Sequence, residues 1–209
     1  NRYFPAYGKV LSTMGSGKLT DVPQHVTGNI KVKETLTLEG KFEATLDVHT
    51  TYVGNEADDM RSYFQSNAKN DIQKQYLEYY TKIYPKINKT GHIQYKDDME
   101  NNIVEVIEKY KIKNIGKKES GSTKKYIPLL GTNINEKLPE IMEDRIAPLS
   151  LSFPTDLTYE MYIVNKGKKE FGNYRDNSYF DRTAYVFGKT LEVNQDSIKL
   201  AYTLSFHEP

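Results

Sequence analysis

Cysteine and tryptophan are both absent from this 209-residue chain. Without cysteine, the chain can form no disulfide bridge, no thiolate nucleophile and no zinc site with cysteine ligands. A predominance of one charge is absent too, because 29 Lys and Arg residues face 28 Asp and Glu residues and leave a formal net charge of +1. Proteins that bind nucleic acid or an acidic membrane surface carry a basic excess. We therefore expect no nucleic-acid partner.

Long apolar runs are also missing, since no stretch approaches the roughly 18 consecutive apolar residues of a membrane-spanning helix. We expect no membrane span. The chain begins at Asn1 and lacks the basic and then apolar start of a signal peptide. The simplest interpretation is a mature, trimmed or excised segment of a longer protein.

Tyrosine is abundant, with 17 Tyr beside 8 Phe. A tyrosine ring packs well on a half-buried strand face while its hydroxyl reaches water. Most of the tyrosines fall in segments with helical or strand periodicity, which favours a packing role. A binding surface built from tyrosine is the alternative.

One long amphipathic helix is predicted over about residues 56–83. Most of the stability of such a helix comes from packing its apolar face, so we expect it to lie on a sheet. Asn55 is the expected N-cap, and Pro85 ends the helix. A charge at Phe64 or Ile72 should unfold this part of the chain. The apolar stripe recurs every three or four positions and consists of Ala57, Met60, Phe64, Ala68, Ile72, Tyr76, Tyr79 and Ile83.

The clearest β-hairpin spans residues 29–53. A three-residue loop that ends at Gly40 pairs Leu36 with Phe42 and places the apolar residues of both strands on one side. Gly40 then adopts the left-handed conformation that glycine tolerates best. The apolar residues share one parity and are Ile30, Val32, Leu36 and Leu38 in the first strand, and Phe42, Ala44, Leu46 and Val48 in the second.

A second hairpin is predicted from residues 91–96 and 103–112, with a polar turn near residues 97–102. Its second strand points Val104, Val106, Tyr110 and Ile112 one way. Glu108 interrupts that apolar face, which predicts an edge strand or a partly covered one.

The C-terminal part of the chain returns to strands. Residues 135–142 are a short helix candidate that carries Leu138 and Ile141, and a turn is expected at Gly188, between residues 180–187 and 190–193. The alternating apolar sets are Leu149, Leu151 and Phe153, then Leu157, Tyr159, Met161 and Ile163, and finally Ile198, Leu200, Tyr202, Leu204 and Phe206.

The fold class predicted from these patterns is mostly β (α+β), with antiparallel β-sandwich-like sheets and the helix packed on a sheet face. Residues 1–28 form an irregular opening segment and 29–113 a hairpin–helix–hairpin unit. Residues 114–122, rich in Gly, Ser and Lys, form a linker or mobile loop, and 123–209 form an antiparallel β unit. The pattern leaves open whether the two β units share one core.

A phosphate-binding loop is suggested by Gly-Ser-Gly-Lys at residues 15–18. Ser12 stands where the motif requires its first glycine, and Leu19 stands where it requires a hydroxyl side chain. A flexible glycine turn is therefore the better interpretation.

No other motif predicts a catalytic, cofactor-binding or metal-binding residue. No histidine has another four residues away, and no serine lies in a nucleophile elbow. The acidic residues near the second turn lack the spacing and central Gly of a calcium loop, so a solvated turn is the better interpretation. Asn88 opens a formal N-glycosylation sequon, which decides nothing. The candidates weighed are His25, His49, His92 and His207 for zinc, and Asp97, Asp98, Glu100 and Asn101 for calcium.

In order and spacing, four stretches resemble the region that follows the catalytic core in bacterial transglutaminase-like proteins, those that also carry a β-sandwich domain of unknown function ahead of the core. The likeness is spread over most of the chain. The stretches are Asn1-Arg2-Tyr3-Phe4-Pro5 with Gly8, the Leu36 to Phe42 hairpin, Gly54, Ala57 and Arg61 in a G-x-x-A-x-x-x-R helix start, and Arg145, Pro148, Leu149, Leu151, Phe153 and Pro154 in an R-x-x-P-L-x-L-x-x-P-like strand.

This resemblance implies that the family's catalytic Cys, His and Asp would lie upstream of Asn1, so no residue here inherits a catalytic role. It implies a non-catalytic accessory β domain of a periplasmic or extracellular cell-envelope protein. Its partners would be the upstream core of the same polypeptide and a protein or glycan ligand, and it would need no cofactor. A free-standing extracellular binding module that uses exposed tyrosines is the alternative, and a hydrolase built from scattered polar residues is a third.

Overall fold

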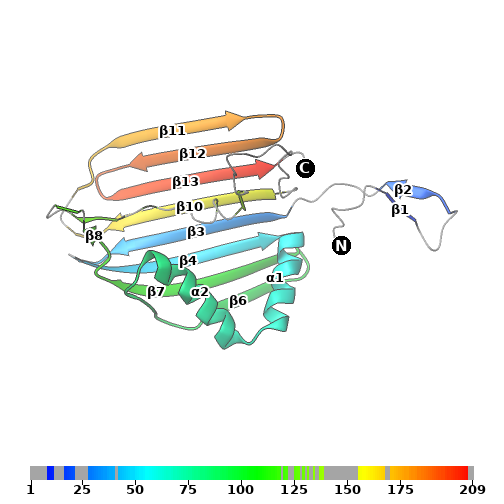
Figure 1. The fold of residues 1–209 in the computed structure, drawn as a ribbon, viewed down its shortest axis with the longest axis horizontal. Helices are drawn as coiled ribbons and strands as arrows, with labels where there is room; N and C mark the ends of the chain where they lie inside the picture. Colours follow the sequence, from blue (N-terminus) through cyan, green and yellow to red (C-terminus); the bar gives the residue numbers. More distant parts are fainter. Residues whose placement is uncertain are drawn as a thin grey trace.

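The computed structural model describes residues 9–11, 17–21, 28–40, 42–118, 120–121, 125–127, 129, 131, 134, 137–138, 155–167 and 170–206. Within them the fold is mostly β, as predicted, and is dominated by one nine-stranded sheet (Figure 1). Its strands, from one edge to the other, are β11 (Tyr174–Asp181), β12 (Tyr185–Val193), β13 (Ser197–Phe206), β10 (Thr155–Asn165), β3 (Asn29–Leu38), β4 (Glu43–Val53) and β7 (Ile103–Lys113), with β5 (Ile87–Lys89) and β6 (Gln94–Asp98) both paired to β7.

Strands from both predicted β units belong to this one sheet, because β3 pairs in parallel with β10. Val32 lies opposite Tyr159 and Leu36 opposite Ile163, and every other pairing in the sheet is antiparallel. A single apolar cluster runs across the joint, from Ile112 on β7 to Leu204 on β13. The two halves therefore share one core.

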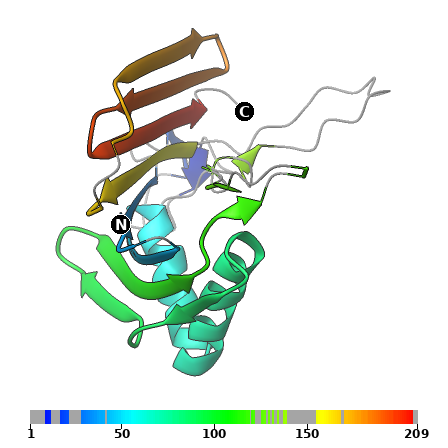
Figure 2. The same cartoon turned by 90° about the vertical axis from the view of Figure 1, so that its left-hand side faces the viewer.

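The predicted sandwich is not what the described strands form, since they make one open, twisted sheet and two small two-stranded ones (Figure 2). Its apolar face is covered by helices over β3, β4 and β7, where a sandwich would place a second sheet. Beside them, Ile127, Leu129 and Ile134 pack against the same core cluster. Within the described residues, these segments, and not a second sheet, cover the main core.

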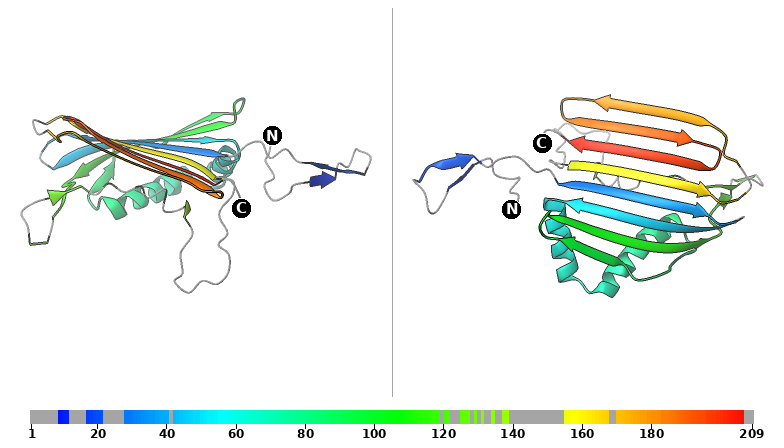
Figure 3. Two further views of the ribbon diagram at one scale, coloured as in Figure 1. Left: turned by 90° about the horizontal axis from the view of Figure 1, so that it is seen from above. Right: turned by 180° about the vertical axis from the view of Figure 1, so that it is seen from behind.

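The opposite face of the sheet is polar and bears neither of the two described helices (Figure 3). Oppositely charged side chains alternate across its strands, as in Lys31, Glu160 and Lys199. The two lysine Nζ atoms lie 3.4 Å and 3.7 Å from the Glu160 carboxylate. Cross-strand pairs of this kind suit a solvated face.

Two helices occupy the stretch predicted as one: α1 (Asn55–Ser66) and α2 (Lys69–Ile83). The chain is extended at Asn67 and Ala68, where the Asn67 side-chain amide donates to the Tyr63 carbonyl (2.8 Å). The single long helix is therefore wrong. Because of the break, α1 covers Val104 and Val106 in a small cluster of its own, while Tyr80 of α2 joins the main core.

Gly54, rather than the predicted Asn55, caps α1. Its backbone (φ 69°, ψ −131°) lies in a region that side chains other than glycine occupy at a cost. Two contacts with Asn102 hold it there: the Gly54 N–H donates to the Asn102 carbonyl, and the Asn102 side-chain amide donates to the Gly54 carbonyl (both 3.1 Å). The strand-to-helix corner is thus tied to the β6–β7 turn.

Replacing Gly54 with alanine should destabilise the protein by about 1–3 kcal/mol, because the added Cβ strains this backbone. Gly91→Ala is the matched control, since the φ of Gly91 is not positive and nothing lies within 4 Å of the added Cβ. We expect that control to change the free energy of unfolding by less than about 0.5 kcal/mol. Urea unfolding of the two variants measures the difference, and equal midpoints would contradict the assignment.

The first hairpin has a different register from the predicted one. Leu36 pairs with Leu46, four positions further along than Phe42, and Gly40 does not adopt a positive φ. The three-residue loop is therefore wrong. The observed register keeps the same apolar side and extends the pairing to Ile30 opposite Tyr52.

The second hairpin is confirmed by the antiparallel pairing of β6 with β7. The prediction of an edge or partly covered second strand is wrong, because β7 lies between β4 on one side and β5 and β6 on the other, and Glu108 on its apolar face is buried. Gly188 also differs from prediction, since it lies inside β12 opposite Thr203 and the turn falls at residues 182–184. A Cβ at Gly188 would lie 2.6 Å from the Thr203 hydroxyl, so a close approach, not a turn, requires glycine there.

The predicted irregular opening segment contains a short antiparallel pair, β1 (Lys9–Leu11) with β2 (Leu19–Asp21). The predicted linker contains β8 (Lys117–Lys118), which pairs with β9 (Lys125–Tyr126), a strand that follows the linker. Most of the helix candidate at 135–142, and the alternating set at Leu149, Leu151 and Phe153, lie outside the described residues.

Candidate functional site: a tyrosine-lined cavity

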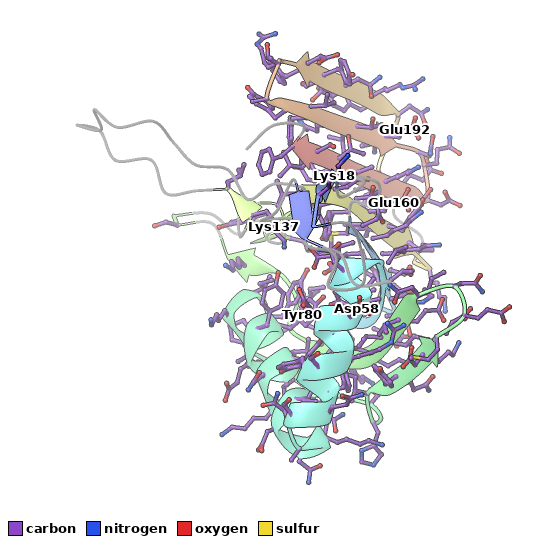
Figure 4. The ribbon with its side chains drawn as sticks, turned by 90° about the vertical axis from the view of Figure 1, so that its right-hand side faces the viewer. Lys18, Asp58, Tyr80, Lys137, Glu160 and Glu192 are labelled. Carbon is purple, nitrogen blue, oxygen red and sulfur yellow. The ribbon has the colours of Figure 1, made fainter. Side chains whose placement is uncertain are left out.

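A cavity of about 320 Å³ lies between α2 and the apolar face of the sheet. This volume is at the lower end of the range for small-molecule sites. Figure 4 shows two of its lining residues, Tyr80 and Lys137, on the helix side of the sheet, with Glu160 and Glu192 on the other. The lining consists of Ile30, Val32, Thr50, Tyr52, Leu157 and Glu108 from the sheet, Tyr63, Gln75, Tyr76, Tyr79 and Tyr80 from the helices, and Lys137.

Two carboxylates stand on the apolar face of the sheet at this point. Glu34 on β3 and Glu108 on β7 lie on either side of Val48, which is paired to both. Only 5% of Glu34 and 4% of Glu108 is exposed to solvent. Charged groups are rarely buried so completely unless they are hydrogen-bonded, so their partners determine what the site can do.

Glu34 receives a hydrogen bond on each oxygen. The Tyr80 hydroxyl donates to Oε1 (2.7 Å) and the Tyr159 hydroxyl to Oε2 (2.9 Å). Burial raises the pKa of Glu34, and the two tyrosine bonds offset part of that rise. Glu34 therefore joins α2, β3 and β10 through one polar cluster.

Glu108 is held by the hydroxyl of Tyr110, two residues along the same strand. The pKa of Glu108 is raised to about 7, because burial and, to a smaller extent, the nearby Glu34 outweigh the lowering by the hydrogen bond from Tyr110. Glu108 is thus the lining carboxylate that changes protonation near neutral pH.

The tyrosines of the lining are linked to one another and to the helices. The hydroxyls of Tyr52 and Tyr76 are hydrogen-bonded to each other, and burial raises the pKa of Tyr52 to about 12 and that of Tyr76 still further. At the exposed side, the Tyr63 hydroxyl of α1 donates to Gln75 Oε1 of α2 (2.5 Å). These tyrosines stay neutral at physiological pH and present ring faces and hydroxyls to the cavity.

Lys137 contributes the basic group of the lining, and its Nζ lies 3.9 Å from Glu56 Oε1 at the start of α1. About a third of the Lys137 side chain is exposed. An ion pair between partly exposed groups contributes little to stability.

The residues weighed for zinc and phosphate do not meet at this cavity. His49 lies on the polar face and its Nε2 is 3.3 Å from Glu105 Oε1, and His92 is exposed in a loop. His25 and His207 lie outside the described residues, as do Gly15 and Ser16, while Gly17 and Lys18 are exposed.

The acidic group near the β6–β7 turn is organised by an arginine. Arg61 of α1 donates from Nε to Asp97 (2.7 Å) and from Nη1 to Asp58 (2.9 Å). Asp98 accepts the backbone N–H groups of Glu100 and Asn101 (3.1 and 3.0 Å). Within the described part of the chain, no three His, Asp or Glu side chains are grouped as a metal site would require.

Sequence reasoning missed both carboxylates of the cluster as candidate residues. Glu34 and Glu108 occupy strand positions whose parity assigns them to the apolar face, and that is the signal that could have found them. Glu108 interrupts an apolar pattern, which in sequence alone indicates an edge or partly covered strand, because the elements that bury it are distant in the chain.

Comparison of the chain with protein-family models, with curated proteins and with solved structures gave no match. Neither α1 nor α2, the helices of the described residues, combines the length and apolar character needed to cross a membrane.

Proposed function

We propose that this chain is a non-catalytic binding domain whose site is the tyrosine-lined cavity under α2. The observation that carries the proposal is the cavity lining itself, in which five tyrosines and the carboxylate of Glu108 surround a space of about 320 Å³. Ring faces and a few fixed polar groups are the usual components of a ligand pocket. The space admits a single side chain or sugar unit of a larger partner, protein or glycan.

Binding is favoured over catalysis by the way the polar groups are engaged. Both oxygens of Glu34 accept tyrosine hydroxyls, and Glu108 is bonded to Tyr110. Among the described residues, the lining contains no histidine or serine that Glu108 could activate as part of a nucleophile–base pair. Tyrosines with strongly raised pKa values are poor proton acceptors near neutral pH.

We further propose that the domain is the accessory domain of a transglutaminase-like cell-envelope protein, periplasmic or extracellular. The proposal is supported by the roles of the three residues of the helix-start motif. Gly54 makes the corner before α1, Ala57 is fully buried against Val104 and Val106, and Arg61 holds the β6–β7 turn. The gene sequence upstream of Asn1 tests it, because a Cys…His…Asp core should be encoded there.

The binding site can be tested by blocking its mouth. Gln75→Trp places an indole at the exposed edge of the cavity, whereas Glu78→Trp places the same group on α2 outside the lining. In ¹H–¹⁵N NMR titrations with chitotetraose, maltotetraose and blocked dipeptides, at least one probe should shift the signals of lining residues. That response should persist in Glu78→Trp and disappear in Gln75→Trp.

Two results would contradict the proposed binding site. In the first, no probe shifts a lining residue. In the second, Gln75→Trp responds as the unaltered protein does.

A further inference from the structure

Two buried carboxylates beside the cavity have no cationic partner among the described residues, and this indicates the charge of the ligand. Glu34 and Glu108 are both buried and lie across Val48 from each other. Among the described residues, no basic side chain forms an ion pair with either carboxylate; the basic side chains closest to the site have other partners. Buried carboxylates without a cation are costly, and a positively charged ligand would offset that cost.

Two lysines lie near Glu108, and each is already engaged. Lys137 lines the cavity and pairs with Glu56 (3.9 Å). Lys89 on β5 lies on the other side of Glu108 and donates to Gln73 Oε1 on α2 (3.1 Å). Among the described residues, these pairings leave Glu34 and Glu108 without a cationic partner.

The aromatic lining suits a cation as well. Tyr52, Tyr76 and Tyr80 bring electron-rich rings to the same space that Glu108 borders. An ammonium group held over such rings is attracted to their faces, and the attraction is stronger where water is excluded. The rings and the carboxylate therefore favour the same kind of ligand.

We propose that the cavity binds an alkylammonium group, either the end of a lysine side chain of a partner or a free amine, with Glu108 as its counter-ion. This inference rests on the proposed binding function and specifies its ligand. The ammonium lies among Tyr52, Tyr76 and Tyr80 and donates to the Glu108 carboxylate, while its alkyl part contacts Ile30, Val32 and Leu157.

Calorimetric or NMR titration at pH 8 with n-butylammonium and with N-acetyl-lysine methylamide separates the two sources of the ammonium group. n-Butanol is the neutral comparison, and it should bind at least tenfold more weakly than n-butylammonium. Glu108→Gln should weaken ammonium binding at least tenfold and leave n-butanol binding unchanged. Glu105→Gln, on the polar face of the same strand, is the matched control and should bind as the unaltered protein does.

The pH dependence of ammonium binding provides a second test. Since the pKa of Glu108 is about 7, the fraction of ionised Glu108, and with it the affinity for n-butylammonium, should rise about tenfold from pH 6 to pH 8. Glu108→Gln should remove that rise. The described titratable or charged groups that face Glu108 are Tyr110 on β7, Glu34 on β3, Tyr52 on β4, Tyr76 and Tyr80 on α2, Lys89 on β5 and Lys137.

The outcomes distinguish this inference from the proposed function. If a sugar or neutral peptide shifts the lining residues while both ammonium probes fail, the ligand class is wrong and the binding site stands. If n-butanol binds as tightly as n-butylammonium, or Glu108→Gln binds both ammonium probes unchanged, the role of Glu108 is overturned. If no probe of either series binds, the site itself is refuted.

Discussion

Replacing Ile72 with aspartate should cost at least about 4 kcal/mol of stability, a large part of the 5–15 kcal/mol that holds a typical domain together. Ile72 lies on α2 and is fully buried. The substitution removes a buried apolar side chain. It also buries a carboxylate that loses its hydrating water and gains no hydrogen-bond partner or cation in exchange. Because strands from both halves of the chain share one sheet and one core, the loss should appear as a single unfolding transition of the whole protein at lower urea concentration.

Asn70→Asp is the control for this experiment, since it places the same carboxylate on the exposed side of the same helix. That change should stay within about 0.5 kcal/mol of the unaltered protein. Far-UV circular dichroism and urea titration report both variants. Equal unfolding midpoints for Ile72→Asp and Asn70→Asp would show that α2 is not seated on the sheet as described.

Glu108→Gln should make the protein more stable at pH 8 than the unaltered chain, by about 2 kcal/mol. The pKa of Glu108 is about 7 in the folded protein, above its ordinary value of 4.5, so between these values the folded state holds a proton that the unfolded state has released. Stability from this group is therefore fully present below pH 4.5 and is lost as the pH rises through 7. At about 1.4 kcal/mol per pH unit, the loss amounts to about 3 kcal/mol, of which an uncharged glutamine avoids most.

Urea unfolding at pH 5 and pH 8 measures this effect. The unaltered protein should lose more stability between the two pH values than Glu108→Gln does. Glu43→Gln should keep the pH dependence of the unaltered chain, because Glu43 is exposed and pairs with Lys111 on the polar face, and neither group changes charge between pH 5 and pH 8. Parallel pH profiles for the unaltered protein and Glu108→Gln would show that Glu108 does not titrate as a buried group.

Strand positions could be predicted from sequence wherever one face is buried, as in β13, where alternate residues from Ile198 to Phe206 lie on the core side. Register could not be predicted in the same way. Shifting the partner of Leu36 from Phe42 to Leu46 keeps every side chain on its own face, so the apolar pattern does not distinguish the two. In the folded protein β4 also pairs with β7 and β3 with β10, and nothing within the hairpin sequence indicates these neighbours.

Two other features could not be predicted from local sequence patterns: the break between α1 and α2, and the burial of Glu34 and Glu108. The apolar period runs on through Ala68, so it contains no sign that the helix ends at Ser66. Glu34 is satisfied by Tyr80 and Tyr159, which lie 46 and 125 positions away in the chain. In the sequence, a buried charge with such distant partners is indistinguishable from a polar residue that merely interrupts the apolar pattern of its strand.

The parallel pairing of β3 with β10 also bears on how the protein is made. As the chain leaves the ribosome, β3 and β4 can form their hairpin early, but β10 follows only about 120 residues after β3. At synthesis rates of about 5–20 residues per second, that side of β3 waits unpaired for roughly 6–25 seconds. An unpaired strand edge invites pairing with other chains, and an inward-pointing charge discourages it. Glu34 occupies such a position on β3, so we expect the residue that binds two tyrosines in the finished protein also to discourage aggregation of the nascent chain.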